Sequence, residues 1–258
     1  MRILAISDLH TDFPKHRNVL EQLSETRYRD DALLVAGDIG SRLELIHATL
    51  SLLQTKFRAV CYVPGNHELW VRRQRYATSI DKFFEVLQIC DEIGVYIRPV
   101  RIGMVRIVPL FSWYSKEFSD DGHEYAYQLK GWTDFYSCHW PEQLADKISE
   151  YFSNLNTPHI RRYDETVISF SHFLPRLELL PPRHFLYFKA LPEVAGSPLI
   201  ETQVRQLGSA IHVFGHSHIP RDVVLSGIRY VNNPLSYHHN GELVTFPEKI
   251  IWQANEER

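Results

Sequence analysis

The fold is decided by Ile3-Leu4-Ala5-Ile6-Ser7-Asp8-Leu9-His10, a short apolar run that ends in a polar cluster. Four consecutive apolar residues with a polar boundary are typical of a strand buried in a sheet. Asp8 and His10 are two positions apart, so on an extended backbone their side chains point the same way. We therefore expect this strand to deliver a carboxylate and an imidazole to one edge of a sheet.

The same pattern recurs four more times along the chain. Apolar runs at residues 32–36, 59–63, 166–170 and 210–214 end in Gly37-Asp38, Pro64-Gly65-Asn66-His67-Glu68, Ser171-His172 and Gly215-His216-Ser217-His218. Amphipathic stretches at residues 17–27, 43–56 and 76–92 predict helices next to the first three strands. Strands alternating with helices indicate the α/β class. Because ligands bind at the carboxyl ends of strands in such sheets, we expect the five polar clusters to converge.

Residues at about 111–165 differ from the rest of the chain. They are rich in tryptophan and tyrosine and have weak periodicity, with a helix expected from Glu142 to Asn154. We interpret them as an insertion or lid-like region over the site edge, with a small core of its own. Residues 221–252 are expected to form closing strands with a turn at Asn240-Gly241, where His238 and His239 are expected in an exposed loop. Residues 1–258 are thus predicted to form one domain.

The polar clusters supply carboxylate, amide and imidazole ligands and no thiolate. Such donors suit manganese, iron or zinc ions bound through oxygen and nitrogen. They do not suit a structural zinc ion, which is typically bound by thiolates. One tetrahedral ion needs about four ligands, whereas two ions that share a carboxylate would use every candidate in the set Asp8, His10, Asp38, Asn66, His172, His216 and His218. We therefore expect two divalent or mixed-valence metal ions (Mn, Fe or Zn).

The order of the five clusters resembles that of the calcineurin-like metallophosphoesterase superfamily, over residues 8–218. The resemblance implies a four-layer α/β/β/α fold, a central β-sandwich flanked by helices, with the metal site at the carboxyl ends of strands. It further implies one metal ion on Asp8, His10 and His218, a second on Asn66, His172 and His216, and Asp38 as the bridge between them.

His67 matches the family's non-ligand histidine near the scissile phosphate, and Glu68 fills the position that commonly orients this histidine. The implied activity is hydrolysis of a phosphomonoester or phosphodiester by direct attack of a metal-bridging hydroxide. Two cations lower the pKa of bound water towards about 7 and neutralise phosphate oxygens. A protonated His67 would assist the leaving group, a contribution of roughly 10²–10⁴-fold.

Two other functions compete with this interpretation. A catalytically silent scaffold or protein-binding module of the same fold typically lacks ligands or the non-ligand histidine, whereas every such position is filled here. A mononuclear hydrolase acting on another bond would leave Asn66 and one imidazole pair without a role.

Composition and charge limit the classes of substrate and binding partner that we expect. The net charge of −3, with acidic and basic residues mixed, gives no reason to expect non-specific nucleic-acid binding. A polynucleotide substrate stays open, because a local basic patch could still form, but a small-molecule phosphate ester is favoured. The sequence shows no secretory signal and no apolar run near the roughly 20 residues of a membrane span. Three widely spaced cysteines suit free thiols, so we expect a cytoplasmic protein.

Overall fold

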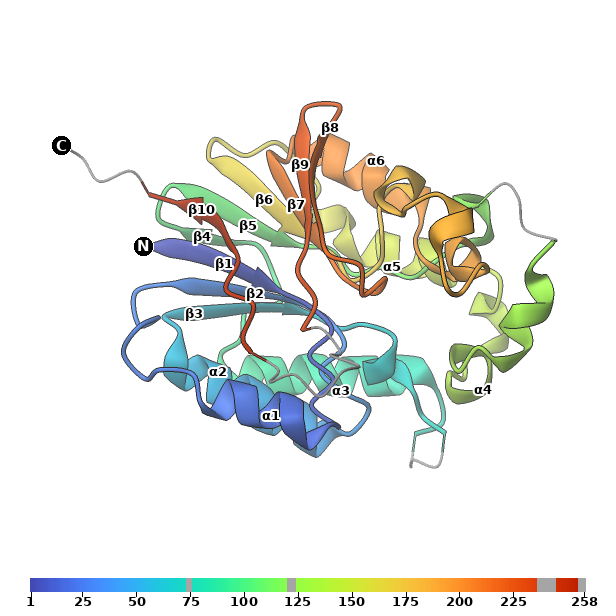
Figure 1. Cartoon of the computed structure of the whole chain (residues 1–258), viewed down its shortest axis with the longest axis horizontal. Helices are drawn as coiled ribbons and strands as arrows, with labels where there is room; N and C mark the ends of the chain where they lie inside the picture. Colours follow the sequence, from blue (N-terminus) through green and yellow to red (C-terminus); the bar gives the residue numbers. More distant parts are fainter. Residues whose placement is uncertain (73–75, 120–123, 236–244, 255–258) are drawn as a thin grey trace.

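Two sheets pack face to face, and helices cover the outer side of each sheet (Figure 1). The computed structural model describes residues 1–72, 76–119, 124–235 and 245–254. The first sheet has the strand order β10-β1-β2-β3 and consists of β1 (Arg2–Ile6), β2 (Ala32–Ala36), β3 (Ala59–Val63) and β10 (Ile250–Gln253). Strands β1, β2 and β3 are parallel, and β10 pairs antiparallel with β1.

The second sheet has the order β4-β5-β6-β7-β9-β8. Its strands are β4 (Val100–Ile102), β5 (Val105–Pro109), β6 (Thr166–Phe170), β7 (Ile211–Phe214), β8 (Arg221–Leu225) and β9 (Ile228–Asn232). Strands β5, β6, β7 and β9 run parallel, while β4 and β8 are antiparallel edge strands. Both sheets therefore present several carboxyl ends of parallel strands.

Alternation along the strands sorts the core into three buried layers. Ile3 and Ala5 pack against the second sheet, whereas Leu4 and Ile6 pack against helices. The outer core of the first sheet includes residues of α1 (Pro14–Glu21), α2 (Leu43–Lys56) and α3 (Ser79–Ile93). The outer core of the second sheet includes residues of α5 (Ile148–Asn156) and α6 (Pro198–Leu207). The predicted α/β/β/α architecture is confirmed.

Helix boundaries follow local chemistry. Helix α3 begins at a capping box in which Thr78 and Asp81 bond each other's backbone N–H groups, and it ends at Gly94 with φ of +84°. Helix α1 was expected at residues 17–27 but begins at Pro14, whose fixed φ suits a first helical turn. It ends at Glu21, and the Ser24 hydroxyl then accepts from the backbone N–H groups of Thr26 and Arg27, which forms a turn.

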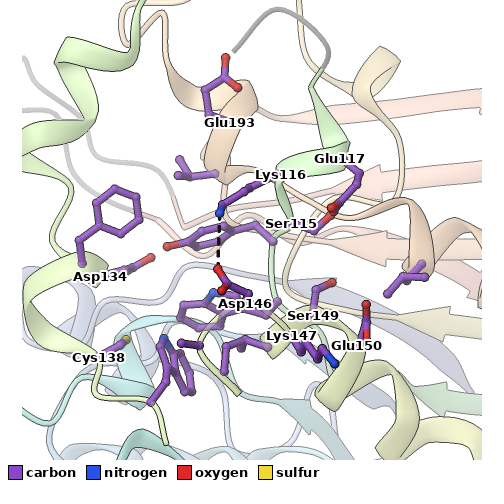
Figure 2. Close-up of a pocket in the computed structure, with 18 of the residues that line it drawn as sticks. Ser115, Lys116, Glu117, Asp134, Cys138, Asp146, Lys147, Ser149, Glu150 and Glu193 are labelled. Carbon is purple, nitrogen blue, oxygen red and sulfur yellow. Dashed lines mark ion pairs between the residues drawn. The ribbon is translucent and has the colours of Figure 1, made fainter. Parts of the chain in front are cut away.

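The aromatic segment folds into short helical pieces. These are η2 (Lys116–Phe118), η3 (Ala126–Gly131), α4 (Asp134–Ser137), η4 (Glu142–Leu144), α5 and η5 (Thr157–His159). Trp113, Phe118 and Phe152 pack with Phe173 in the outer core of the second sheet, so they extend this core instead of forming a separate one. Together with residues near and in α6, the segment lines a cavity of about 1030 Å³ (Figure 2).

The remaining short helices are η1 (His67–Leu69), η6 (Leu177–Leu179), η7 (Arg183–Phe185) and η8 (Leu191–Val194). The closing strands are β8, β9 and β10, with a turn at Ser226-Gly227 between β8 and β9. The predicted turn at Asn240-Gly241, with His238 and His239, lies outside the described residues. Within the described ranges, no helix has the length and apolar character that crossing a bilayer requires. The single-domain organisation stays a prediction.

Candidate metal centre

The seven predicted ligands follow the carboxyl ends of five strands, and the structure brings them into one cluster. They come from the ends of β1 (Asp8, His10), β2 (Asp38), β3 (Asn66), β6 (His172) and β7 (His216, His218). All except His218 are buried. The two parallel strand sets therefore meet at one edge of the sandwich, as the sequence pattern predicted.

The backbone at these positions is unusual. Among the described residues other than glycine, positive φ angles occur at Ser226 and at five members of the cluster, namely Asp8, His10, Asp38, His216 and His218. A left-handed conformation is unfavourable for a residue with a Cβ and persists only where the surroundings impose it. Its concentration here indicates that the chain is turned sharply after β1, β2 and β7 in order to aim these side chains at one another.

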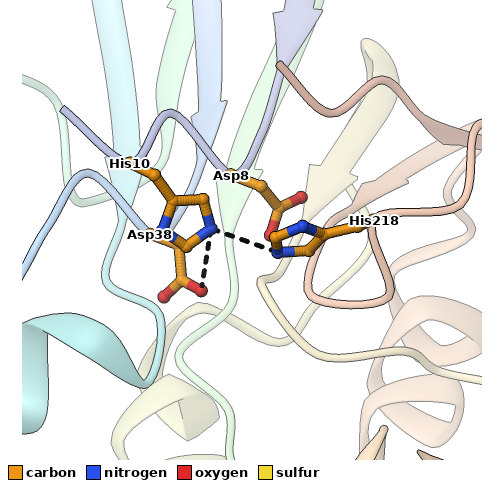
Figure 3. Close-up of side chains that lie close together, drawn as sticks. All are labelled: Asp8, His10, Asp38 and His218. Carbon is orange, nitrogen blue, oxygen red and sulfur yellow. Dashed lines mark hydrogen bonds and ion pairs between the residues drawn. The ribbon is translucent and has the colours of Figure 1, made fainter. Parts of the chain in front are cut away.

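The first group of donors consists of Asp8, His10, Asp38 and His218, whose ligand atoms all lie within 4.8 Å of one another (Figure 3). The Nε2 atoms of His10 and His218 are 3.1 Å apart. His10 Nε2 lies 3.9 Å from Asp38 Oδ2, and His218 Nε2 lies 3.4 Å from Asp8 Oδ1. Two imidazole nitrogens and two carboxylates thus converge on one point.

The second group consists of Asp38, His172 and His216, again within 4.8 Å of one another. The Asn66 Oδ1 atom lies 3.1 Å from both His172 Nε2 and His216 Nδ1. Asp38 Oδ2 lies 3.5 Å from His172 Nε2, so Asp38 belongs to both groups. The shared carboxylate is the geometric feature that two adjacent metal ions would require.

Hydrogen bonds fix the imidazole tautomers of the second group. His172 Nδ1 donates to the carbonyl oxygen of Ala36 at 2.8 Å, and His216 Nε2 donates to that of Val194 at 3.0 Å. Because a carbonyl can only accept, the proton of each neutral ring lies on the nitrogen that points away from the cluster. The opposite nitrogens, His172 Nε2 and His216 Nδ1, keep lone pairs that face Asn66 and Asp38.

The electrostatics of the cluster also fit a cation. Burial lowers the pKa of His10, His172 and His216, which keeps these rings in the neutral form that coordinates metals. Burial, Glu68 and Asp8 raise the pKa of Asp38 well above its usual value. A divalent cation would reverse this last shift by stabilising the ionised carboxylate. The donor set and its protonation therefore match a metal centre.

His67 lies at the open side of this cluster. Its backbone N–H donates to Asp38 Oδ1 at 3.1 Å, and its side chain is 25% exposed. The imidazole packs on Trp70 with ring centroids 3.7 Å apart and meets the His10 ring edge-on at 4.7 Å. It can therefore reach a substrate that binds at the cluster.

Glu68 has a different role from the one expected. Its buried carboxylate accepts from the backbone N–H groups of Asp38, Ile39, Gly40 and Gly65. These bonds join the loop after β2 to the loop after β3, because the η1 turn directs Glu68 inward while His67 stays at the surface. Glu68 thus shapes the turn that carries Asp38, and it does not orient the His67 ring.

Asp134 of α4 was not singled out in the sequence. Its carboxylate is 3% exposed and accepts from Asn66 Nδ2 at 2.9 Å, Trp70 Nε1 at 2.6 Å and Trp132 Nε1 at 3.0 Å. Burial raises its pKa, and these hydrogen bonds oppose the shift. A lone aspartate in an aromatic segment has no motif spacing, so only its place in the fold reveals the contact with Asn66.

Comparison with known proteins agrees with this geometry. A family model described as calcineurin-like phosphoesterase matches residues 1–220. The chain belongs to the calcineurin-like phosphoesterase family. This phosphoesterase is therefore an enzyme, a metal-dependent phosphoric ester hydrolase.

Two comparisons lead to one relative of this phosphoesterase. The chain is 28% identical over 253 residues to the acyl-carrier-protein phosphodiesterase PptH of Mycobacterium tuberculosis, covering 90% of this chain and 77% of the relative. The crystal structure of the phosphopantetheinyl hydrolase PptH from the same organism superposes with a TM-score of 0.76 at 27% identity. That superposition covers 92% of this chain and 89% of the other.

Proposed function

We propose that this phosphoesterase is a dinuclear metallohydrolase that cleaves the phosphodiester joining a phosphopantetheinyl group to a carrier protein. The observation that carries the dinuclear part is Asp38, whose carboxylate is common to both groups of donors. The substrate part rests on the similarity to PptH, which extends along nearly the whole chain. This proposal favours a protein-borne phosphate ester over the free small molecule favoured by composition.

Two ions, when bound, would supply a hydroxide near neutral pH and positive charge beside the phosphate oxygens. We assign Asp8, His10 and His218 to one ion, Asn66, His172 and His216 to the other, and Asp38 to both. Manganese, iron and zinc all suit these donors. Direct attack by water on phosphorus would leave no phosphorylated enzyme intermediate.

The chain's own residues would then orient the ester and move a proton. The His67 imidazole lies 3.8 Å from Asp38 Oδ2, beside the cluster, and would donate a proton to the leaving oxygen. For a carrier protein that leaving group is a serine alkoxide, which is too basic to depart readily without a proton. Trp70, packed against the His67 ring, holds the imidazole in one orientation. We also propose a cytoplasmic location, consistent with the free thiols of Cys61, Cys90 and Cys138.

The test combines metal analysis with turnover. The purified protein would be analysed for bound metal and assayed with manganese on an aryl phosphate, an aryl phosphodiester and a carrier protein bearing phosphopantetheine. The variants are His67→Ala and Asp38→Asn, with His47→Ala on the exposed side of α2 as the control.

We expect the wild type to bind two metal ions per chain. Asp38→Asn should lose both metal and turnover. His67→Ala should retain the metal, with turnover about 10²–10⁴-fold lower. Full turnover with a single ion would contradict the dinuclear proposal. Two bound ions without turnover on any ester would instead favour the scaffold alternative. Cleavage of the aryl diester but not of the carrier protein would contradict only the proposed substrate and would leave the dinuclear mechanism in place.

A further inference from the structure

The cavity beside the metal centre has no role in the chemistry described so far. It is lined by some of residues 113–119, 129–150 and 193–199, which belong to the aromatic segment, to η8 and to the first turn of α6 (Figure 2). Its volume of about 1030 Å³ is at the upper end of the range that holds a drug-sized ligand. An exposed ion pair between Lys116 and Asp146, with nitrogen and oxygen 3.6 Å apart, spans its rim.

Two residues that line the cavity also form hydrogen bonds with side chains of the metal centre. Asp134 lines the cavity and also accepts the amide hydrogen of Asn66. Val194 lines it as well, and its carbonyl oxygen accepts the His216 Nε2 proton. The cavity and the metal cluster are therefore adjacent, with these two residues between them.

The chemistry of the lining selects the kind of substituent. Four aromatic side chains contribute to the wall, namely Trp113, Tyr114, Phe135 and Trp140. The charged lining residues are Lys116 and Lys147 against Glu117, Asp134, Asp146, Glu150 and Glu193, two cations and five anions. An excess of negative charge repels a nucleotide or any other anionic group. Aromatic walls with hydroxyl groups such as those of Tyr114 and Ser149 suit an uncharged chain that has both methyl and amide groups.

We propose that this cavity binds the pantetheine arm of the substrate. The inference rests on the proposed function, because the arm is the uncharged substituent of the phosphodiester that PptH-like activity would cleave. The arm contains a dimethyl-substituted carbon, two amides and a terminal thiol, and it carries no charge at neutral pH. The phosphate at its other end would lie at the metal centre, and the carrier protein would remain outside.

The test fills the cavity without changing the core. Ala145 and Leu199 line the cavity, and Ala145 is exposed while Leu199 is half-buried, so Ala145→Trp and Leu199→Trp reduce its volume. Ala126→Trp, at an exposed alanine of η3 that does not line the cavity, is the matched control. Binding of pantetheine and of adenosine monophosphate would be measured by calorimetry on the full chain loaded with manganese. Thermal melting and metal content would establish that each variant is folded.

We expect the wild type and Ala126→Trp to bind pantetheine in preference to the nucleotide. Both filled variants should bind it at least tenfold more weakly and show a KM for the holo carrier protein raised by a similar factor. Unchanged pantetheine binding in both filled variants, absence of binding to the wild type, or preference for the nucleotide would overturn the inference. If pantetheine binds in the cavity but the carrier protein is not cleaved, the proposed function fails and the binding site stands. If Ala145→Trp and Leu199→Trp cleave the carrier protein as well as the wild type does, the proposed function is supported. The proposed binding of the pantetheine arm in the cavity is then contradicted.

Discussion

The Asn66 side-chain amide donates to the Asp134 carboxylate at 2.9 Å, across 68 positions of the sequence. This bond uses the nitrogen end of the amide, so the oxygen end faces His172 and His216. The aromatic segment thus fixes the orientation of a proposed metal ligand from outside the sheets. Such supporting contacts typically change metal affinity by 10–100-fold when removed.

The first prediction concerns this contact. Asp134→Asn removes the negative charge and one of the two oxygens that accept from Asn66, Trp70 and Trp132, which weakens the hold on the Asn66 amide. We expect the affinity for the second metal ion to fall about 10–100-fold, measured by metal titration. Asp91→Asn, at an exposed carboxylate of α3 paired with Arg98, is the control and should leave metal binding unchanged. Equal metal affinity in both variants would show that Asp134 does not position Asn66.

A second prediction follows from the close approach of Gly65 to the cluster. A Cβ at this position would lie inside van der Waals contact of Asp38 Oδ1 and 2.8 Å from His172 Cε1. Gly65→Ala should therefore displace the shared carboxylate, with loss of bound metal and of aryl phosphodiester hydrolysis. Gly131→Ala, where a Cβ meets nothing within 4 Å, should retain both. Full metal occupancy in Gly65→Ala would mean that the two loops move apart at little cost.

Glu68 provides a third prediction, now about stability. A glutamine at this position keeps one acceptor oxygen but turns an NH₂ group towards two backbone N–H donors, either those of Ile39 and Gly40 or those of Asp38 and Gly65. We expect Glu68→Gln to lower the free energy of unfolding by about 2–4 kcal/mol, because hydrogen bonds to a buried charge are lost. Urea denaturation of the metal-free protein would measure it, with the exposed Glu178→Gln as the control. A change as small as that of the control would contradict the bridging role of Glu68.

The fourth prediction concerns pH. His212 is fully buried between the hydroxyls of Ser169 and Ser171, and burial lowers its pKa to about 3. The unfolded chain takes up this proton below a pKa of about 6.5, whereas the folded chain does not. Stability from this group is therefore complete above pH of about 6.5 and declines as the pH falls towards 3.

At pH of about 5 the loss from His212 amounts to about 2 kcal/mol, from one and a half pKa units at roughly 1.36 kcal/mol each. Urea denaturation of wild type and His212→Asn at pH of about 8 and 5 measures this difference, with His47→Asn as the control. We expect wild type and the control to lose about 2 kcal/mol more than His212→Asn on acidification. Parallel losses in all three proteins would show that His212 titrates normally in the folded state.

The sequence by itself determined the strands that end in polar clusters and the residues that those clusters deliver. An apolar run followed by Asp8 and His10, or by His216 and His218, is a local pattern that places these residues just past the end of a strand. The expected strand alternation does not continue through them, because their backbone is left-handed and this turn directs the side chains. Because parallel strands place their carboxyl ends along a common edge, the convergence of these groups followed from the pattern as well. The four-layer architecture came from the family resemblance and was confirmed.

Only the tertiary structure decided what surrounds those residues. The bond of Asp134 to Asn66, the backbone N–H groups held by Glu68 and the cavity beside the cluster all depend on segments far apart in the chain. No periodicity encodes such contacts, since they arise from the packing of irregular turns in the aromatic segment. The physical reason is that strand and helix patterns record short-range backbone geometry, whereas the orientation of a ligand and the shape of a binding cavity depend on long-range packing.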